Sequence, residues 1–319
     1  MGDRTGIAWT DATWNPLRGC SRESEGCRHC YAERVASRFS GPGLPYEGLA
    51  RDGRWTGKVR FIEEHLADPL RWQKPRRIFV NSMSDLFHPN VPDEWIDRIF
   101  AVMAISPRHT FQVLTKRPKR MLRYLSDRHT EERTARASVF FVPNAALTAK
   151  GIEADLQQEA MVGWAEWPLP NVWLGVSVED QRTADERVPL LLQTPAAVRF
   201  VSYEPALGPV DFTDIVLERS AGGETHFDAL TCDVPAEDDG PYLGRTLDWI
   251  IVGGESGQNA RLFDVEWARR TRDACKRAGV AFFYKQGGAS NRCAHDSNGG
   301  HLECFPIDLQ VREFPDVIR

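Results

Sequence analysis

Seven short apolar runs, rich in β-branched and aromatic residues, recur along the chain and constrain its fold more than any other feature. Most are nearly continuous in hydrophobicity rather than alternating, which is typical of strands in a parallel sheet covered on both faces. We therefore expect these runs to form the strands of such a sheet. They are Thr13–Leu17 (the weakest), Arg77–Asn81, Thr110–Leu114, Val172–Val176, Val198–Ser202, Trp249–Val252 and Ala281–Tyr284.

Helical patterns lie between these runs. One predicted helix begins at Pro92 and Asp93 and carries an apolar stripe. A second predicted helix has Asp264 as its N-cap and Gly279 at its C′ position. Strand and helix alternating about six times predict an α/β fold, either a β/α barrel or an open doubly wound sheet. We expect a single domain over residues 1–319, with insertions near 126–170 and 218–246.

Polar clusters follow directly on six of the expected strands. In parallel α/β folds the functional site lies at the carboxyl ends of the strands, so this rim is the expected active site. The alternative is that these loops are polar because they are solvated. The clusters are Ser82–Asp85, Thr115–Arg117, Ser177–Asp180, Ser202–Glu204, Gly253–Ser256 and Lys285–Gln286.

The composition is that of an ordinary globular protein, with 42% apolar and 27% charged residues in 319. It excludes a disordered chain, a collagen and a small disulfide scaffold. No apolar run approaches 18 residues and the N-terminus lacks a signal-peptide core, so we expect a cytoplasmic protein with reduced cysteines and no membrane partner. Residues 1–125 carry a charge of +7 and the remainder −12, which favours a local phosphate-contacting face over nonspecific DNA coating.

Three cysteines are bunched in the pattern Cys20-x6-Cys27-x2-Cys30, between the first expected strand and a helix-like run. Three thiolates can bind three irons of a 4Fe–4S cluster and leave the fourth iron open to S-adenosylmethionine (SAM), whose cleavage gives a carbon radical. Zinc is the alternative, although a structural zinc site takes four ligands and a partner Cys-x2-Cys is missing. A separate zinc site is conceivable among Cys293, His295, His301 and Cys304.

The stretches Asn15–Cys20 and Gly26–Glu33 look like the cluster loop of radical SAM enzymes. They are most similar to the DNA-repair photolyase (spore photoproduct lyase-like) group. The usual spacing there is Cys-x3-Cys-x2-Cys, so this chain has three extra residues in the first gap. His29 occupies the usually aromatic position that borders the cofactor.

Six further stretches resemble the phage-type three-Cys-motif family of uncharacterised radical-SAM-like proteins, which occurs in phages, prophages and bacteria. The resemblance implies a partial TIM-like barrel of the radical SAM type with about six or seven parallel strands, and it supplies no reaction. The stretches are Ile7–Pro16, Asn81–His88, Phe111–Pro118, Trp173–Glu179, Phe200–Pro205 and Val252–Gly257.

The resemblance also implies cofactor contacts. The loop after the second strand would hold the amino group of SAM through Ser84 and Asp85, although Asp85 could instead cap a helix or turn. Ser177 and Glu179 would contact the ribose, and paired glycines would let the backbone approach a ligand closely. The full expected cofactor-binding set is His29, Ser84, Asp85, Ser177, Glu179, Gly253, Gly254 and Glu255.

Two more groups at this rim are candidates. Glu204 and Lys285 are the expected catalytic residues, with a salt bridge in the barrel mouth as the alternative for Glu204. The basic run Lys116–Arg123 could contact nucleic-acid phosphates or form a solvated helix start. Its expected contacts are Lys116, Arg117 and Arg120, and Trp9, Trp14 and Trp55 could stack on a base or pack in the core.

The leading hypothesis from the sequence is a radical SAM enzyme that modifies or repairs a nucleic-acid base or nucleotide. It would need an electron donor such as flavodoxin or ferredoxin, and a genetically linked protein is a further candidate partner. One alternative is a non-enzymatic nucleic-acid-binding protein of a phage or mobile element with a structural metal centre. Another is a zinc-dependent hydrolase on a barrel.

Overall fold

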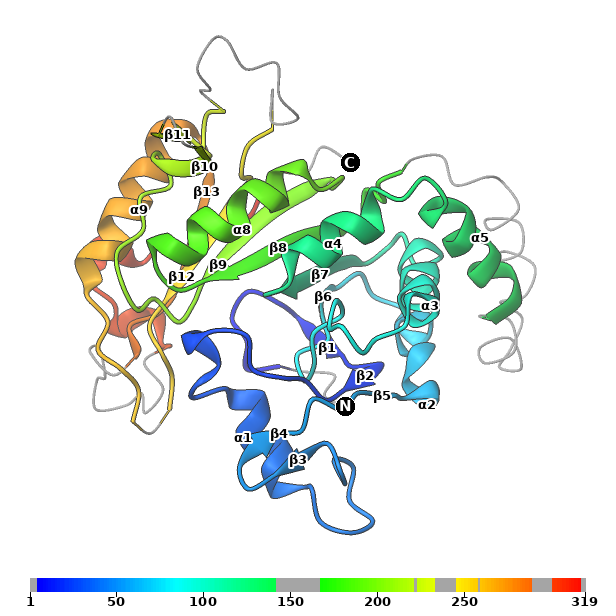
Figure 1. Ribbon diagram of the computed structural model, residues 1–319. Coiled ribbons are helices and arrows are strands. Elements are labelled where there is room, and N and C mark those ends of the chain that lie inside the picture. The colour runs from blue at the N-terminus through cyan, green and yellow to red at the C-terminus, as the bar shows by residue number, and fades with distance from the viewer. Residues whose placement is uncertain are drawn as a thin grey trace. The chain divides into compact units, whose positions relative to one another are not determined.

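The computed structural model describes residues 5–141, 167–220, 223–232, 245–257, 259–288 and 300–316. Its main sheet has seven strands in the order β1-β6-β7-β8-β9-β12-β13 (Figure 1). The pairs β1–β6, β6–β7, β9–β12 and β12–β13 are parallel. The strands are β1 (Ala12–Trp14), β6 (Arg77–Val80), β7 (Thr110–Thr115), β8 (Val172–Val178), β9 (Val198–Tyr203), β12 (Trp249–Gly253) and β13 (Ala281–Gln286).

The order of these strands in the sheet is also their order along the chain. A doubly wound sheet reverses its strand order at a switch point, and this sheet does not. The chain therefore has an α/β fold of the partial β/α barrel type, and the predicted fold class is confirmed. Six of the seven predicted apolar runs form strands of this sheet, whereas the first, Thr13–Leu17, contributes only Thr13 and Trp14 to it. Every residue of β8 is buried, as expected for a strand covered on both faces.

The contacts within the chain define two compact units. Unit 1 comprises Met1–Glu23, Cys27–Leu174 and Pro195–Ala197, and unit 2 comprises Ser24–Gly26, Gly175–Thr194 and Val198–Arg319. Strand β8 has residues in both. The prediction of a single domain stays a prediction.

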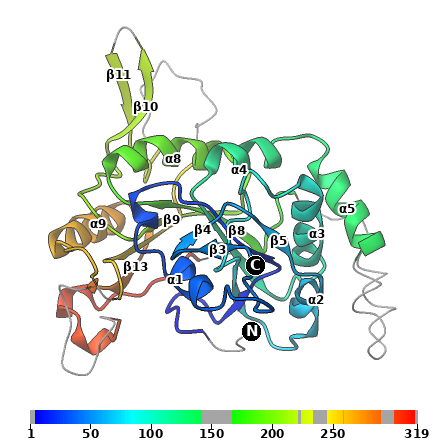
Figure 2. The same ribbon diagram turned by 60° about the horizontal axis from the view of Figure 1, so that its bottom comes forward.

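Unit 1 contains β1, β6, β7 and the first five helices. Helix α3 buries Ile96, Ile99, Phe100 and Met103, the apolar stripe expected from the sequence. Helices α3 and α5 pack against each other and lie side by side in both views (Figures 1 and 2). The elements are α1 (Tyr31–Arg38), α2 (Glu63–Leu66), α3 (Asp93–Ala104), α4 (Pro118–Leu125), α5 (Thr130–Phe141), and two small antiparallel sheets, β2 (Leu17–Arg18) with β5 (Arg60–Phe61) and β3 (Ala50–Arg51) with β4 (Arg54–Trp55).

Unit 2 contains β9, β12, β13, α8 (Gln181–Gln193) and α9 (Val265–Ala278). Helix α9 begins as predicted, because the Asp264 carboxylate accepts a hydrogen bond from the Glu266 N–H, and it ends at Gly279 with a φ of 73°. The antiparallel hairpin of β10 (Ile215–Ser220) and β11 (Gly223–Phe227) packs on α8 and projects beyond it in Figure 2.

The two predicted insertions are only partly described. The first contains α5, while residues 142–166 lie outside the described residues. The second contains β11 and the end of β10, while residues 233–244 lie outside them. None of the helices in the described ranges combines the length and apolar character that a membrane span requires. The described residues also include short 3-10 helices at Glu25–Cys27, Asp68–Arg71, Leu302–Cys304 and Ile307–Leu309.

Candidate functional site

Three loops of unit 1 meet at the carboxyl ends of its strands. The Gly19 N–H donates to the Met83 carbonyl at 3.3 Å, and Gly19 forms a parallel bridge with Ser84. The cysteine loop therefore lies beside the loop that follows β6. Gly19 has a φ of 96°, and an added Cβ would lie 2.2 Å from the Lys58 carbonyl oxygen, so only glycine fits there.

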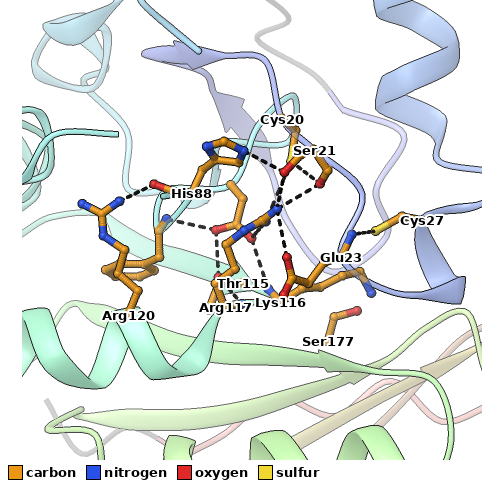
Figure 3. A network of polar contacts seen from close by, with 12 residues as sticks. Cys20, Ser21, Glu23, Cys27, His88, Thr115, Lys116, Arg117, Arg120 and Ser177 are labelled. Carbon is orange, nitrogen blue, oxygen red and sulfur yellow. Dashed lines mark hydrogen bonds and ion pairs between the residues drawn. The ribbon is translucent and has the colours of Figure 1, made fainter. Parts of the chain in front are cut away.

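Arg117, which follows β7, connects the three loops (Figure 3). Its side chain is only 7% exposed. Nη1 donates to Asp85 Oδ2 at 2.8 Å, and Nη2 donates to the carbonyl and the hydroxyl of Ser21, both at 2.9 Å. Nη1 also lies 3.9 Å from Cys20 Sγ, and Glu23 is a second acidic partner at 3.3 Å. A buried cation thus contacts the cysteine loop and the loop after β6 together.

Asp85 accepts four hydrogen bonds within unit 1. Oδ1 accepts from the Thr115 hydroxyl at 2.8 Å and the Phe87 N–H at 2.9 Å. Oδ2 accepts from the Lys116 N–H at 3.2 Å and from Arg117. A carboxylate offers about four lone-pair positions, so all are in use. An ammonium group would have to replace one of these donors, and the predicted SAM contact of Asp85 stays a prediction.

The three clustered cysteines are half-buried free thiols in unit 1. Burial raises the pKa of the Cys20 thiol to about 12; the Asp85 carboxylate adds to this rise and Arg117 opposes it. Burial also raises the pKa of Cys30, which caps the N-terminus of α1. The Glu23 N–H donates to Cys27 Sγ at 3.5 Å. A polar hydrogen therefore points at two of the three sulfur atoms.

A second guanidinium group lies near the other two thiols. Arg22 forms an ion pair with the buried Glu33 at 2.6 Å. The hydrogen bond to Glu33 raises the pKa of Arg22, and the charges of Cys27 and Cys30 add to this rise. Glu33 lies within the stretch Gly26–Glu33, and no sequence pattern indicated Arg22 as its partner. Arg22 and Arg117 thus lie near the three sulfurs, and each is paired with a carboxylate, Glu33 or Asp85.

His88 completes this network. Its Nδ1 accepts a hydrogen bond from the Asn90 N–H at 3.1 Å, so a neutral ring carries its proton on Nε2 and donates to the Ser21 hydroxyl at 2.8 Å. Burial and then the nearby Arg117 lower the pKa of His88 to about 4. His88 is therefore neutral near pH 7. Apart from its place in the stretch Asn81–His88, no sequence pattern pointed to this residue.

The donor set fits an iron–sulfur cluster by its chemistry. In the part of the chain that the structure describes, no three His, Cys, Asp or Glu side chains are already gathered as a metal site. The loop nonetheless supplies three free thiols, two flanking guanidinium groups and N–H donors directed at sulfur. The buried Nε of Arg117 also has no hydrogen-bond partner among the described residues. The predicted ligands Cys20, Cys27 and Cys30 stay a prediction.

Other predicted cofactor residues of unit 1 lie in the same loops. The Ser84 hydroxyl donates to the Leu17 carbonyl at 3.2 Å, which holds the loop after β6 against β2. His29 is half-buried between the 3-10 helix Glu25–Cys27 and α1. Trp9 and Trp14 are core residues, so the alternative of base stacking is wrong for both.

The basic run after β7 is engaged inside the protein. Besides Arg117, Arg120 forms an ion pair with Asp93 at 2.7 Å and donates to the carbonyls of His88 and Val91, with its side chain 14% exposed. Neither guanidinium group extends into solvent as a phosphate ligand would. Lys116 is half-buried. The predicted nucleic-acid contacts of these three residues stay untested.

In unit 2, each predicted acidic site residue has a cationic partner from the same unit. Glu179 is only 1% exposed, and it also accepts a hydrogen bond from the Ser24 hydroxyl at 2.7 Å. An added Cβ on Gly26 would lie 2.4 Å from the Oε1 atom of Glu179. No sequence pattern indicated Arg187 or Arg261 as partners. The pairs are Glu179 with Arg187 at 3.2 Å, Glu204 with Lys285, and Glu255 with Arg261 at 2.6 Å.

The two predicted catalytic residues lie together. Glu204 and Lys285 form an ion pair with side chains 16% and 19% exposed, so the salt bridge considered for Glu204 is present. Gln286 Nε2 also approaches the same carboxylate at 3.4 Å, and the Ser177 hydroxyl donates to the Glu204 carbonyl at 3.1 Å. A catalytic role for the pair stays a prediction.

Of the paired glycines after β12, Gly254 has the clearer structural reason. An added Cβ would lie 2.9 Å from Phe263 Cβ and 3.1 Å from the Gly287 carbonyl group. At Gly253 the nearest atom would be Gln286 Cγ at 3.3 Å. The close approach at Gly254 is therefore to the protein's own backbone, and an approach to a ligand stays a prediction.

The remaining cysteines differ from one another. Cys275 is fully buried on α9, and burial raises its pKa to about 12. Cys304 is disulfide-bonded, so the expectation of reduced cysteines is wrong for this residue. A disulfide sulfur is not a thiolate ligand, which removes Cys304 from the conceivable zinc site. Cys293 and His295 of that site lie outside the described residues.

The fold and these loops define an α/β protein of the partial-barrel type. The chain belongs to the family described as protein of unknown function (DUF5131), whose model matches residues 4–308. No curated protein and no solved structure matches the chain. The family description gives no activity, so the function has to be argued from the site.

Proposed function

We propose that the protein is a radical SAM enzyme that acts on a nucleic-acid base or nucleotide. Cys20, Cys27 and Cys30 would bind a 4Fe–4S cluster and leave one iron open for SAM. The observation that carries the proposal is the meeting of three βα loops of unit 1 around Arg117. One of them supplies the thiols, and Arg117 contacts Cys20, Ser21 and Asp85 together.

The residues around the thiols would hold and orient the bound groups. Reductive cleavage of SAM at such a cluster supplies a carbon radical, which is the chemistry of the cofactor. Arg117 keeps the cysteine loop against the loop after β6 through its two hydrogen bonds to Ser21. Arg22 and Arg117 offset the charges of Glu33 and Asp85, which would otherwise oppose an anionic group at the sulfurs. Neutral His88 donates to Ser21 and adds no competing charge.

A nucleic-acid substrate is supported by the charge distribution and by the resemblance stated above. The first 125 residues, which contain all three cysteines, carry the chain's excess of positive charge. The cluster would draw its electron from a donor such as flavodoxin or ferredoxin. The nucleic-acid substrate and the electron donor are both part of the proposal.

Iron content tests the metal centre. After anaerobic reconstitution we expect iron, sulfide and a broad absorbance near 400 nm in the wild type. Cys27→Ser should lose most of the iron, because its loss leaves a second iron without a protein ligand. Cys275→Ser is the matched control, since this thiol is fully buried on α9. Equal iron loss from both variants contradicts the assignment.

Formation of 5′-deoxyadenosine tests the reaction class. The reduced, reconstituted protein should convert SAM to 5′-deoxyadenosine and methionine, and Cys27→Ser should not. Iron without 5′-deoxyadenosine would favour the alternative of a nucleic-acid-binding protein with a structural metal centre. Zinc in place of iron would favour the hydrolase.

A further inference from the structure

Helix α1 begins directly after Cys30 and has two different faces. Its inner face buries the small residues Ala32 and Ala36 against Leu49 and Ala50. Small side chains allow the helix to pack closely on the β3–β4 hairpin, and contacts join α1 to both strands. This packing explains how the helix is held and leaves its other face to solvent.

The outer face carries an exposed stripe. Tyr31, Arg34 and Arg38 follow one another at positions i, i+3 and i+7, which places them on one side of the helix. Tyr31 is 60% exposed, and Phe39, at the C-terminal end of the helix, is 48% exposed. These are the two exposed large aromatic side chains among the described residues. We call Tyr31, Arg34, Arg38 and Phe39 the α1 face.

The two arginines of the α1 face are not paired with other side chains that the structure describes. Neither Arg34 nor Arg38 has a side-chain hydrogen bond or an ion pair with any residue that the structure describes. Like charges four residues apart on a helix repel each other slightly, although Arg38 also lies in the last turn, where a cation interacts favourably with the helix C-terminus. Residues 28–60 contain seven Arg and Lys residues and three acids, one of which, Glu33, is already paired with Arg22.

We propose that the α1 face binds single-stranded nucleic acid, with bases stacked on Tyr31 and Phe39 and phosphates at Arg34 and Arg38. Exposed rings combined with free cations are the elements of single-strand binding, because unpaired bases offer ring faces that a duplex hides. Eight residues of helix separate the two rings along the axis by about 12 Å. That distance accommodates about three stacked nucleotides at 3.4 Å each.

The choice of nucleic acid as the partner rests on the proposed function. Binding of a strand at the α1 face does not itself require the iron–sulfur cluster. Because Cys30 caps α1, a strand that stacks on Tyr31 lies next to the cysteine loop. An acidic protein such as an electron donor would use the cations and would not need two exposed rings. The rings therefore favour a nucleic-acid strand over an acidic protein surface.

Fluorescence anisotropy of the full-length protein with labelled 12-nucleotide single strands of DNA and RNA, and with a duplex, tests the proposal. At 50 mM salt we expect the single strand to bind more tightly than the duplex. Tyr31→Ala with Phe39→Ala should weaken binding at least 10-fold. Arg34→Gln with Arg38→Gln should make the log–log salt slope less negative by about 1.4, since two fewer phosphates are neutralised.

The matched control is Arg270→Gln with Arg277→Gln, two exposed arginines on α9 in unit 2, and it should leave binding unchanged. All variants should keep the wild-type far-UV circular dichroism and melting temperature, because the changed side chains are solvent-exposed. Wild-type affinity in the aromatic variant overturns the proposal, as does an absence of single-strand binding by the wild type. Displacement of the strand by poly-glutamate, together with intact binding in the aromatic variant, would assign the face to an acidic protein.

The proposed function can fail separately. If the wild type forms no 5′-deoxyadenosine but binds single strands through the α1 face, the radical SAM assignment fails and this inference stands. If it forms 5′-deoxyadenosine and no strand binds, only this inference fails.

Discussion

The ion pair between Asp85 and Arg117 should matter for stability more than any exposed pair of the chain. Both side chains are less than 10% exposed. Asp85→Asn replaces the acceptor of the Arg117 and Lys116 donors with an amide group whose N–H atoms would face them. Removing one partner of a buried pair costs about 3–5 kcal/mol of stability because a charge stays buried and unpaired.

The expected cost for Asp85→Asn is somewhat smaller, about 2–4 kcal/mol. Arg117 retains its two hydrogen bonds to Ser21 and its ion pair with Glu23, whose side chain is 42% exposed. A typical domain has a total stability of about 5–15 kcal/mol, so the loss would be readily measurable.

Urea unfolding at pH 7, followed by far-UV circular dichroism, measures this loss. Glu186→Gln is the control, because its pair with Arg182 is solvent-exposed and should contribute less than about 0.5 kcal/mol. Adding Arg117→Met to Asp85→Asn should recover part of the loss, since the unpaired charge is then removed as well. A cost below about 0.5 kcal/mol for Asp85→Asn, or no recovery in the double variant, refutes the reasoning.

Two further predictions concern His88, which belongs to this network, and Gly26, which lies in unit 2. The pKa of His88 is lowered to about 4, so the unfolded chain binds more protons between about pH 6.5 and pH 4, and stability must fall as the pH falls through that window. From pH 7 to pH 5 the His88 contribution amounts to about 2 kcal/mol, and urea unfolding of His88→Gln should show a correspondingly weaker pH dependence; an unchanged dependence contradicts the shift. Gly26→Ala should destabilise the protein by roughly 1–3 kcal/mol, because the new Cβ would displace the buried Glu179 carboxylate. Gly6→Ala, which has open space around it, is the control in the same thermal melt, and equal melting temperatures for the two variants would count against the packing argument.

The strands of the main sheet could be predicted because the signal is local. A strand buried on both faces has a continuous apolar sequence, and six of the seven predicted runs form strands of the sheet, while Thr13–Leu17 does so only at Thr13 and Trp14. The cap residues of α9 were equally visible, since an N-cap and a C′ glycine act within their own turn. The two-residue strands β2 to β5 and the hairpin β10–β11 were missed. Such short pairs bury too little to leave a hydrophobic period in the sequence.

The candidate site was only half predictable for a physical reason. Residue type and position after a strand indicated Asp85, Glu179, Glu204 and Glu255. They also indicated Arg117 and Lys285 as site residues, but not which acid Arg117 pairs with, and they did not indicate Arg187 or Arg261. A carboxylate buried in a barrel end requires a cation or several hydrogen-bond donors, so the existence of partners follows from burial. Their identity does not, because Arg117 pairs with Asp85 across 32 residues and Lys285 with Glu204 across 81.

This partner requirement also changes where ligand contacts should be sought. Arg117 and Arg120 looked like phosphate ligands because they follow a strand, yet their donors are largely used inside unit 1. Arg34 and Arg38 left no such signal in the sequence, and their side chains contact no described acid. The guanidinium groups of Arg34 and Arg38 are therefore available to contact a binding partner. The α1 face is therefore the more informative place to test nucleic-acid binding than the basic run after β7.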